Sequence, residues 1–184
     1  MSSAQSQSQS PFPPVRRVVT GHTPAGKSTV IADTVQPARF VAPQTSERLV
    51  PVYDLHYAAE APAVIDTEIS KGEWVDEIKA HPEVFHGSGS NFRCWDFAPG
   101  MVSPLHRTVT LDYAIVFRGS ITLELEEGER ITLNEGDTVV QRGTMHTWRN
   151  ESKEWAKVYF VMTGAKPIEI DGKTLEETFR DAKY

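Results

Sequence analysis

The sequence predicts an all-β fold in which short antiparallel strands form a sandwich or barrel. From residue 92 to residue 164, six apolar runs of four to ten residues follow one another. Turn residues separate these runs at regular intervals, as at Pro99-Gly100, Gly119 and Gly128. Regular short strands are typical of sandwiches and barrels, whereas a doubly wound α/β fold alternates strands with helices. We expect a single domain over residues 15–184.

The first fourteen residues differ in composition from the rest of the chain. They read MSSAQSQSQSPFPP, a Ser/Gln repeat followed by prolines. The segment lacks the apolar side chains that a packed core requires. We expect a disordered tail over residues 1–14.

The segment TGHTPAGKST matches a phosphate-binding pattern, G-x-x-x-x-G-K-[ST], at Gly21, Gly26, Lys27 and Ser28. A phosphate-binding loop needs a helix that begins near the lysine, because the backbone N–H groups at a helix N-terminus hold the phosphate. The residues that follow, TVIADTV, are mostly β-branched and favour a strand. The sequence therefore predicts a hairpin of two strands, and no nucleotide is expected.

One short helix is expected near residues 70–80. In the segment EISKGEWVDEIKAHPEVF, Trp74 and Ile78 lie four residues apart with acidic residues between them. This spacing places both apolar side chains on one helical face, and Pro82 would end the helix.

A second helix is expected at the C-terminus, in the segment TLEETFRDAKY. Thr174 and Glu177 have the spacing of a capping box, in which each side chain bonds a backbone N–H of the first turn. Leu175 and Phe179 would share one face and pack against the β domain.

The composition excludes several classes of partner. The net charge is −6, and the basic residues are scattered singly or in pairs. Nucleic acids and anionic membranes bind clustered cations, so neither partner is expected. No long uncharged apolar stretch predicts a signal peptide or a membrane span. The single cysteine, Cys94, fits a reducing compartment, and we expect a soluble cytoplasmic protein.

Two of the six histidines lie in specific patterns. His106 falls in GMVSPLHRTVTLDYAIVFRG, and His146 falls in GDTVVQRGTMHTWRN. These segments resemble the two signatures of the cupin superfamily, G-x5-H-x-H-x3/4-E-x6-G and G-x5-P-x-G-x2-H-x3-N. The resemblance covers residues 91–164 with motif support, and it implies a double-stranded β-helix, or jelly roll.

The match is incomplete at positions that bear on chemistry. The first signature keeps Gly100, His106 and Gly119, and the second keeps Gly136, His146 and Asn150. Thr108 stands where the second histidine belongs, and Asp112 stands where the glutamate belongs. Arg142 replaces the proline, and the turn before His146 is one residue shorter.

The resemblance implies that His106, Thr108, Asp112 and His146 surround one cavity. Two imidazoles and one carboxylate suit a divalent metal, so His106, Asp112 and His146 are expected ligands for Fe, Mn, Ni or Zn. Because Asp is shorter than Glu, Asp112 could instead orient a histidine or act as an acid or base.

Four further residues are expected to contact a substrate. Arg107 and Arg142 lie beside the motif histidines and could orient an anionic or phenolic molecule. Thr108 stands at a position that points into the cavity in the family. Trp148, two residues after His146, would form an aromatic wall.

The segment from Pro104 to Asn150 also resembles small single-domain cupins of fungal polyketide clusters, described as cupin-domain oxidoreductases of salicylaldehyde-type pathways. This implies a tailoring enzyme of secondary metabolism, a metal-dependent oxidoreductase acting on an aromatic or aldehyde intermediate. Two alternatives stay open: a metal-free or zinc-dependent lyase, dehydratase, isomerase or decarboxylase, and a cupin that binds a small molecule without turnover. A homodimer is expected, because the N-terminal hairpin offers an exposed strand edge.

Overall fold

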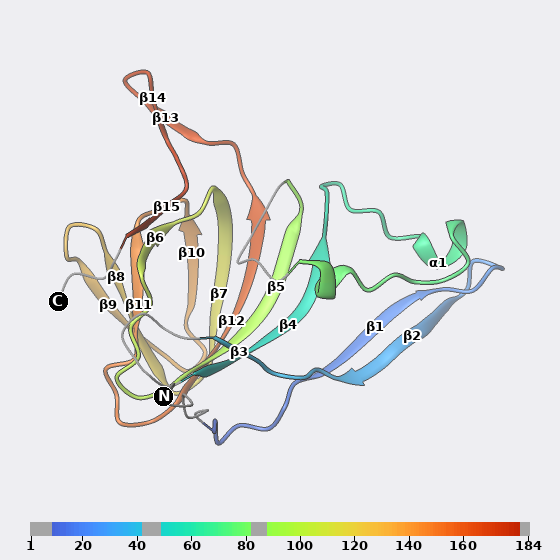
Figure 1. Cartoon of the computed structure of the whole chain (residues 1–184), viewed down its shortest axis with the longest axis horizontal. Coiled ribbons are helices and arrows are strands. Elements are labelled where there is room, and N and C mark those ends of the chain that lie inside the picture. Colours follow the sequence, from blue (N-terminus) through green and yellow to red (C-terminus); the bar gives the residue numbers. More distant parts are fainter. Residues whose placement is uncertain (1–8, 42–48, 82–87, 181–184) are drawn as a thin grey trace, which may run out of the picture.

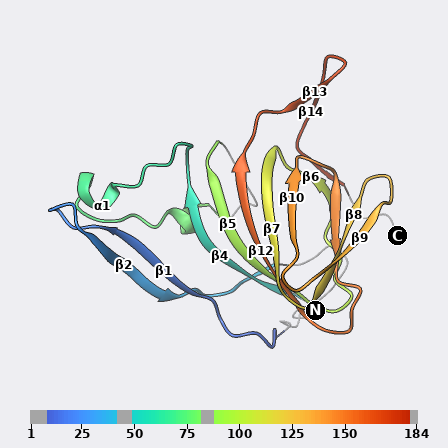
Figure 2. The ribbon, with the colours of Figure 1, turned by 180° about the vertical axis from the view of Figure 1, so that it is seen from behind.

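Two antiparallel β-sheets face each other in this computed structural model, which describes residues 9–41, 49–81 and 88–180 (Figures 1 and 2). One sheet has six strands in the order β10-β7-β12-β5-β4-β3. These are β3 (Arg39–Val41), β4 (Val50–Ala58), β5 (Ser90–Phe97), β7 (Thr110–Arg118), β10 (Thr138–Arg142) and β12 (Ala156–Gly164). The other has five strands in the order β15-β6-β11-β8-β9. These are β6 (Leu105–Arg107), β8 (Ser120–Leu125), β9 (Arg130–Asn134), β11 (His146–Arg149) and β15 (Thr178–Arg180).

The chain crosses between the two sheets at almost every connection from β5 to β12. Strands β5, β7, β10 and β12 lie in the six-stranded sheet, and β6, β8, β9 and β11 lie in the other. This alternation produces a double-stranded β-helix, so the predicted all-β jelly roll is confirmed.

The core lies between the two sheets because the strands alternate inward apolar and outward residues. In β7, Ala114 and Val116 are buried, whereas Ile115 and Phe117 between and beside them are exposed. Partners from the facing sheet include Ile121, Leu123 and Trp148. Each such apolar side chain contributes about 1.5–3 kcal/mol when fully buried, so this layer supplies much of the fold's stability.

The predicted N-terminal hairpin is confirmed. Strand β1 (Arg16–His22) pairs with β2 (Ser28–Val35), and Gly26 permits the turn with a φ of 74°. The residues after Lys27 form a strand, so no helix begins at Gly26-Lys27-Ser28. In Figure 1 the hairpin projects away from the two sheets.

The single helix predicted near residues 70–80 is replaced by two separate turns. An α-helical turn, α1 (Thr67–Ser70), ends before Gly72, whose φ of 80° is outside the helical region. A 3₁₀ turn then covers Glu77–Ala80, and the side chain of Asp76 accepts a hydrogen bond from the Ile78 N–H. Pro82 lies outside the described residues. No helix in the described ranges is long and apolar enough to cross a membrane.

The predicted C-terminal helix is wrong. Strands β13 (Ile168–Ile170) and β14 (Lys173–Leu175) form a hairpin, and β15 then pairs with β6. Asp171 and Gly172 both have positive φ, at 50° and 72°, as the Asp-Gly turn of a tight hairpin requires. The turn places Thr174 inside a strand, where it cannot cap a helix. Residues 181–184 lie outside the described part of the chain.

The expected tail falls mostly outside the described residues. Residues 9–14 have no helix or strand, and the ring of Phe12 lies 5.4 Å from the Nζ of Lys157. Residues 1–8 are not described, so disorder over residues 1–14 stays a prediction.

Candidate functional site

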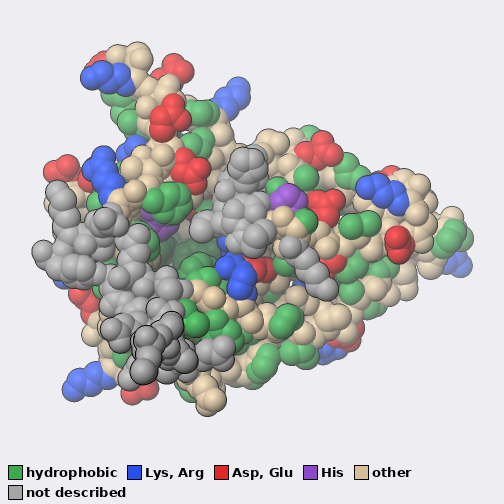
Figure 3. Space-filling model, in the orientation of Figure 1, with side chains coloured by type: hydrophobic (Ala, Val, Ile, Leu, Met, Phe, Trp, Pro, Cys, Tyr) green, Lys and Arg blue, Asp and Glu red, His purple; other side chains and the backbone are tan. Residues whose placement is uncertain are grey.

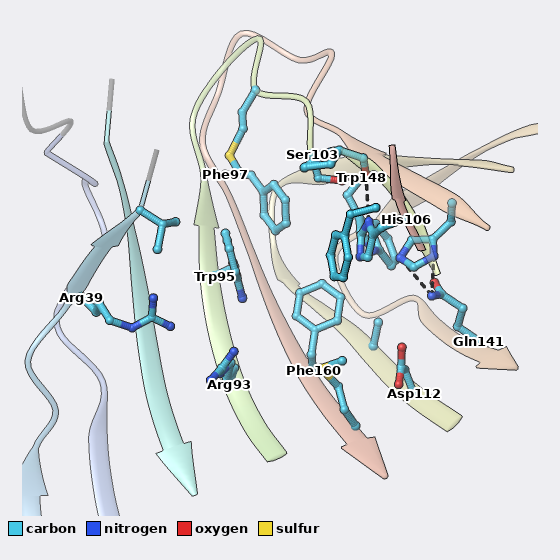
Figure 4. Close-up of a pocket in the computed structure, with 17 residues that line it drawn as sticks. Arg39, Arg93, Trp95, Phe97, Ser103, His106, Asp112, Gln141, Trp148 and Phe160 are labelled. Carbon is cyan, nitrogen blue, oxygen red and sulfur yellow. Dashed lines mark hydrogen bonds between the residues drawn. The ribbon is translucent and has the colours of Figure 1, made fainter. Parts of the chain in front are cut away.

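A cavity of about 270 Å³ opens between the two sheets. Its walls are mainly aromatic and apolar, with contributions from Trp95, Phe97, Met101, Trp148, Phe160, Met162 and Phe179. The polar side chains that reach it include His106, Asp112, Gln141 and His146 (Figure 4). Figure 3 shows a hollow lined by hydrophobic side chains on this face of the molecule. An apolar pocket with few polar groups is typical of a site for a small molecule.

His106 and His146 form a cross-strand pair. They are direct partners in the register of β6 and β11, and their ring centroids lie 4.2 Å apart. The Nδ1 of His106 lies 2.8 Å from the Pro104 carbonyl, and the Nδ1 of His146 lies 2.9 Å from the Thr144 carbonyl. Because a carbonyl only accepts, each Nδ1 carries the proton and each Nε2 carries a lone pair.

Gln141 distinguishes the two histidines. Its amide nitrogen lies 2.9 Å from the Nε2 of His146 and 2.7 Å from the Nδ1. Since the Nδ1 proton points to the Thr144 carbonyl, the amide donates to Nε2. No described residue makes a hydrogen bond to the Nε2 of His106, which is therefore the available base of the pair.

Burial keeps both imidazoles neutral. It lowers the pKa of His106 below the ordinary value of 6.5, against a small opposing effect of the bond to the Pro104 carbonyl. Burial, and then the neighbouring His106, lower the pKa of His146 to about 3. Near pH 7 both rings therefore carry no charge.

Asp112 is a buried carboxylate on the opposite sheet. It lies in β7, in register with Gln141 of β10, and 6% of its surface is exposed. Its Oδ1 atom is buried without a hydrogen-bond partner among the described residues. Burial raises the pKa of Asp112 to about 6, although the Thr110 hydroxyl opposes the change. A carboxyl with this pKa exchanges a proton near neutral pH.

The donors do not form the expected metal centre as they are placed. Among residues 9–41, 49–81 and 88–180, no group of three or more His, Cys, Asp or Glu side chains is arranged to hold a metal ion. The Nε2 of His146 is directed at Gln141, and Asp112 is not grouped with the histidines. These positions do not fit a three-ligand centre, so a metal on His106, Asp112 and His146 stays a prediction.

Trp148 lines the cavity and packs edge-on against His146, with centroids 6.0 Å apart. Thr108, by contrast, does not line this cavity: it is buried, and its hydroxyl lies 2.6 Å from that of Thr110. The chain passes from one sheet to the other between Arg107 and Thr110, so Thr108 does not line the cavity together with His106, Asp112 and His146 as expected.

Arg107 and Arg142 do not line the cavity of the histidines. Both line a second cavity on the other side of the β6–β7 connection, together with Thr108. The sequence places each arginine beside a motif histidine, but it does not indicate which way the arginine side chains point.

Three groups at the cavity were not predicted. Gln141 lies two residues after Val139 in β10 and therefore on the same inward face, and this period of two is a signal that could have found it. Phe179 was assigned to a helix, although it stacks on His106 with centroids 5.4 Å apart. Arg93 and Arg39 lie at the far end of the cavity (Figure 4). Both contact Asp54, at 2.6 and 3.0 Å.

Comparisons with known proteins place the chain in a family. Residues 93–163 match the family described as "Cupin domain". Three relatives are similar over most of their length. "Oryzines biosynthesis cluster protein J" of Aspergillus oryzae is 32% identical, and the alignment covers 94% of this chain and 96% of that protein. "Phomopsin biosynthesis cluster protein D" of Diaporthe leptostromiformis is 37% identical and covers 86% and 83%.

The third relative carries a name that describes an activity. It is a "Cupin-domain-containing oxidoreductase", virC, of Hypocrea virens, 31% identical over 93% of this chain and 88% of its own. The identity exceeds 30% across nearly the whole length of these relatives, and the matched segment contains both histidine motifs. The chain therefore belongs to the cupin family.

Proposed function

We propose that this chain is a small-molecule tailoring enzyme of secondary metabolism, in which His106 and Asp112 move protons on an aromatic or aldehyde intermediate. The observation that carries the proposal is the buried, unpartnered carboxylate oxygen of Asp112 in an apolar cavity that also holds a neutral histidine pair. Buried polar groups are normally paired, and an unpaired one marks a place where a ligand supplies the partner.

The biosynthetic setting rests on the relatives. Two of them are named for fungal biosynthesis clusters, and a third is named an oxidoreductase. The apolar and aromatic walls suit a flat, weakly polar substrate, because such a ring packs against Trp148 and Phe160 without losing hydrogen bonds to water.

His106 would act as the proton acceptor. Its Nδ1–H donates to the Pro104 carbonyl, which fixes the ring with the Nε2 lone pair available. The Nδ1–H of His146 donates to the Thr144 carbonyl, and its Nε2 accepts from the Gln141 amide. His146 is therefore fixed in place and helps to orient His106. Asp112, on the facing sheet, would give a proton to the substrate oxygen. One proton leaves and one arrives, which is the balance of an isomerisation or of the loss of water.

An oxidoreductase is the second candidate, and the name of the virC relative favours it. In that case a divalent metal held by His106, Asp112 and His146 would supply Lewis-acid or oxygen chemistry. The described side chains would have to come closer together to hold it. Elemental analysis of purified protein, followed by assay after exhaustive chelation, separates the two candidates, since full activity in metal-free protein rejects the oxidoreductase version.

Proton transfer itself can be tested without knowing the natural substrate. A panel of aromatic aldehydes and hydroxyketones is incubated with the protein in D2O, and exchange or isomerisation is followed by proton NMR. The Asp112→Asn and His106→Gln variants should each lower the rate about 10²–10⁴-fold. Asp33→Asn, which changes an exposed carboxylate of the hairpin, is the matched control. Wild-type rates in both site variants would refute the proposal.

A further inference from the structure

The second cavity, where Arg107 and Arg142 lie, is about 510 Å³ in volume. Three segments enclose it: the β6–β7 connection at residues 107–111, the β10–β11 turn at 142–144, and the base of the β13–β14 hairpin. The hairpin projects above the sheets in Figure 1. A backbone hydrogen bond of 3.1 Å from the Ala165 N–H to the Val109 carbonyl ties the hairpin arm to the first segment.

The charge of this cavity is opposite to that of the chain. Arg107, Arg142 and Lys166 line it, and none of the described lining residues is acidic. The whole chain, with its net charge of −6, has an excess of carboxylates. Three cations without a lining carboxylate attract an anion, because the cations repel one another and a bound anion would offset this repulsion.

Arg107 has donor capacity left for a ligand. Its Nη2 lies 4.0 Å from Glu126, which is too long for a hydrogen bond, and Glu126 is closer to Arg180, at 3.1 Å. Its Nε is buried without a hydrogen-bond partner in the described part of the chain. An oxyanion that bound here would satisfy a buried donor that the protein leaves unpaired.

The remaining walls are apolar. Val109, Leu111, Ile168 and Leu175 form most of the surface between the cations. Gly143, with a φ of 60°, brings the turn close to the hairpin, since a Cβ there would lie 3.6 Å from the Cδ1 of Ile168. A ligand that fills the cavity therefore needs an apolar body as well as an anionic head.

We propose that this second cavity binds an amphiphilic carboxylate, with Arg107 and Arg142 at the head group and the Ile168–Leu175 side of the hairpin against the apolar chain. Arginine suits the head group because its planar fork donates two parallel hydrogen bonds to a carboxylate. The site is separate from the cavity of His106, although the β10–β11 turn connects the two cavities. Thr144 lines the second cavity, and its carbonyl holds His146.

Isothermal titration with octanoate tests the proposal. Octanoate should bind, whereas acetate, which lacks the chain, and 1-octanol, which lacks the charge, should bind at least about tenfold more weakly. Binding should weaken as NaCl is raised from about 0.05 to about 0.5 M, because the Debye length shortens over this range and the charges of the site are screened more strongly. Equal affinity for octanoate and 1-octanol would overturn the proposal.

Variants locate the site. The double variant Arg107→Met/Arg142→Met should lower octanoate affinity by about tenfold or more, whereas Arg118→Met, which removes an exposed arginine of β7, should leave it unchanged. Asp112→Asn should also have no effect. If octanoate bound beside His106 instead, Asp112→Asn would strengthen binding and the double variant would not weaken it, and that result rejects the second site. Circular dichroism and Tm confirm that each variant is folded.

Discussion

The ring of Phe179 lies nearly parallel to the imidazole of His106, with an interplanar angle of 7° and centroids 5.4 Å apart. The contact exists because β15 pairs with β6 and places Phe179 directly opposite His106 in the register. The C-terminal strand thus covers one face of the histidine that the proposed mechanism uses as its base. Removing the ring should expose the imidazole without cutting any of its hydrogen bonds.

Replacing Phe179 by Ala is expected to raise the pKa of His106 toward 6.5. Burial is the first cause of its lowered pKa, and the phenyl ring contributes to that burial. Two-dimensional NMR of the imidazole resonances over pH 4–8 measures the shift. Phe117→Ala, which removes an exposed ring on the outer face of β7, is the control. An unchanged His106 titration in the Phe179 variant would show that β15 does not shield the site.

Ionisation of Asp112 should destabilise the folded protein. Its folded pKa is about 6, above the ordinary value of 3.8, so the folded state binds more protons between these limits. The free energy of unfolding therefore falls as pH rises from about 4 to 6, by on the order of 3 kcal/mol at most. Urea unfolding at several pH values measures the slope. Asp112→Asn should flatten this part of the profile, and a slope equal to that of the wild type would contradict the assignment.

The strand pattern explains which parts of the site the sequence could predict. His106 and His146 lie in motifs, so their partnership was expected before their register was known. Gln141 lies on the inward face that the period of two in β10 indicates, whereas Phe179 reaches the cavity only because β15 pairs with β6, and no local spacing encodes that pairing. Asp171-Gly172 was readable as a hairpin turn, but the capping-box spacing around Thr174 pointed to a helix instead. The hairpin turn and the capping-box spacing therefore favoured different structures for the C-terminal segment, and the free edge of β6 favoured a strand.

A buried ion pair on the outer face of the six-stranded sheet should matter for stability. The Nζ of Lys157 lies 2.8 Å from Asp96, and both side chains are almost completely buried. Asp96→Asn leaves the ammonium without its counter-charge, which costs about 3–5 kcal/mol for a buried pair. Urea unfolding at pH 7 measures the loss. The double variant Asp96→Asn/Lys157→Met should recover most of it, and a single variant as stable as the wild type would contradict the role of the pair.

The homodimer expected from the sequence can be tested on the same outer face. Tyr113, Ile115 and Phe117 of β7 are each more than 40% exposed, and the aromatic row continues through Tyr159 to Phe92. A contiguous exposed apolar patch of this kind marks an interaction surface.

A second copy of the chain would cover this patch. We expect light scattering with size-exclusion chromatography to give twice the mass of the chain, and Ile115→Asp to give a monomer, because the new charge would lose its hydration in the interface. Ile65→Asp, in the exposed loop before α1, should leave the mass unchanged. A wild-type protein that remains monomeric at high concentration would reject the dimer, and a dimer that survives Ile115→Asp would place its interface elsewhere.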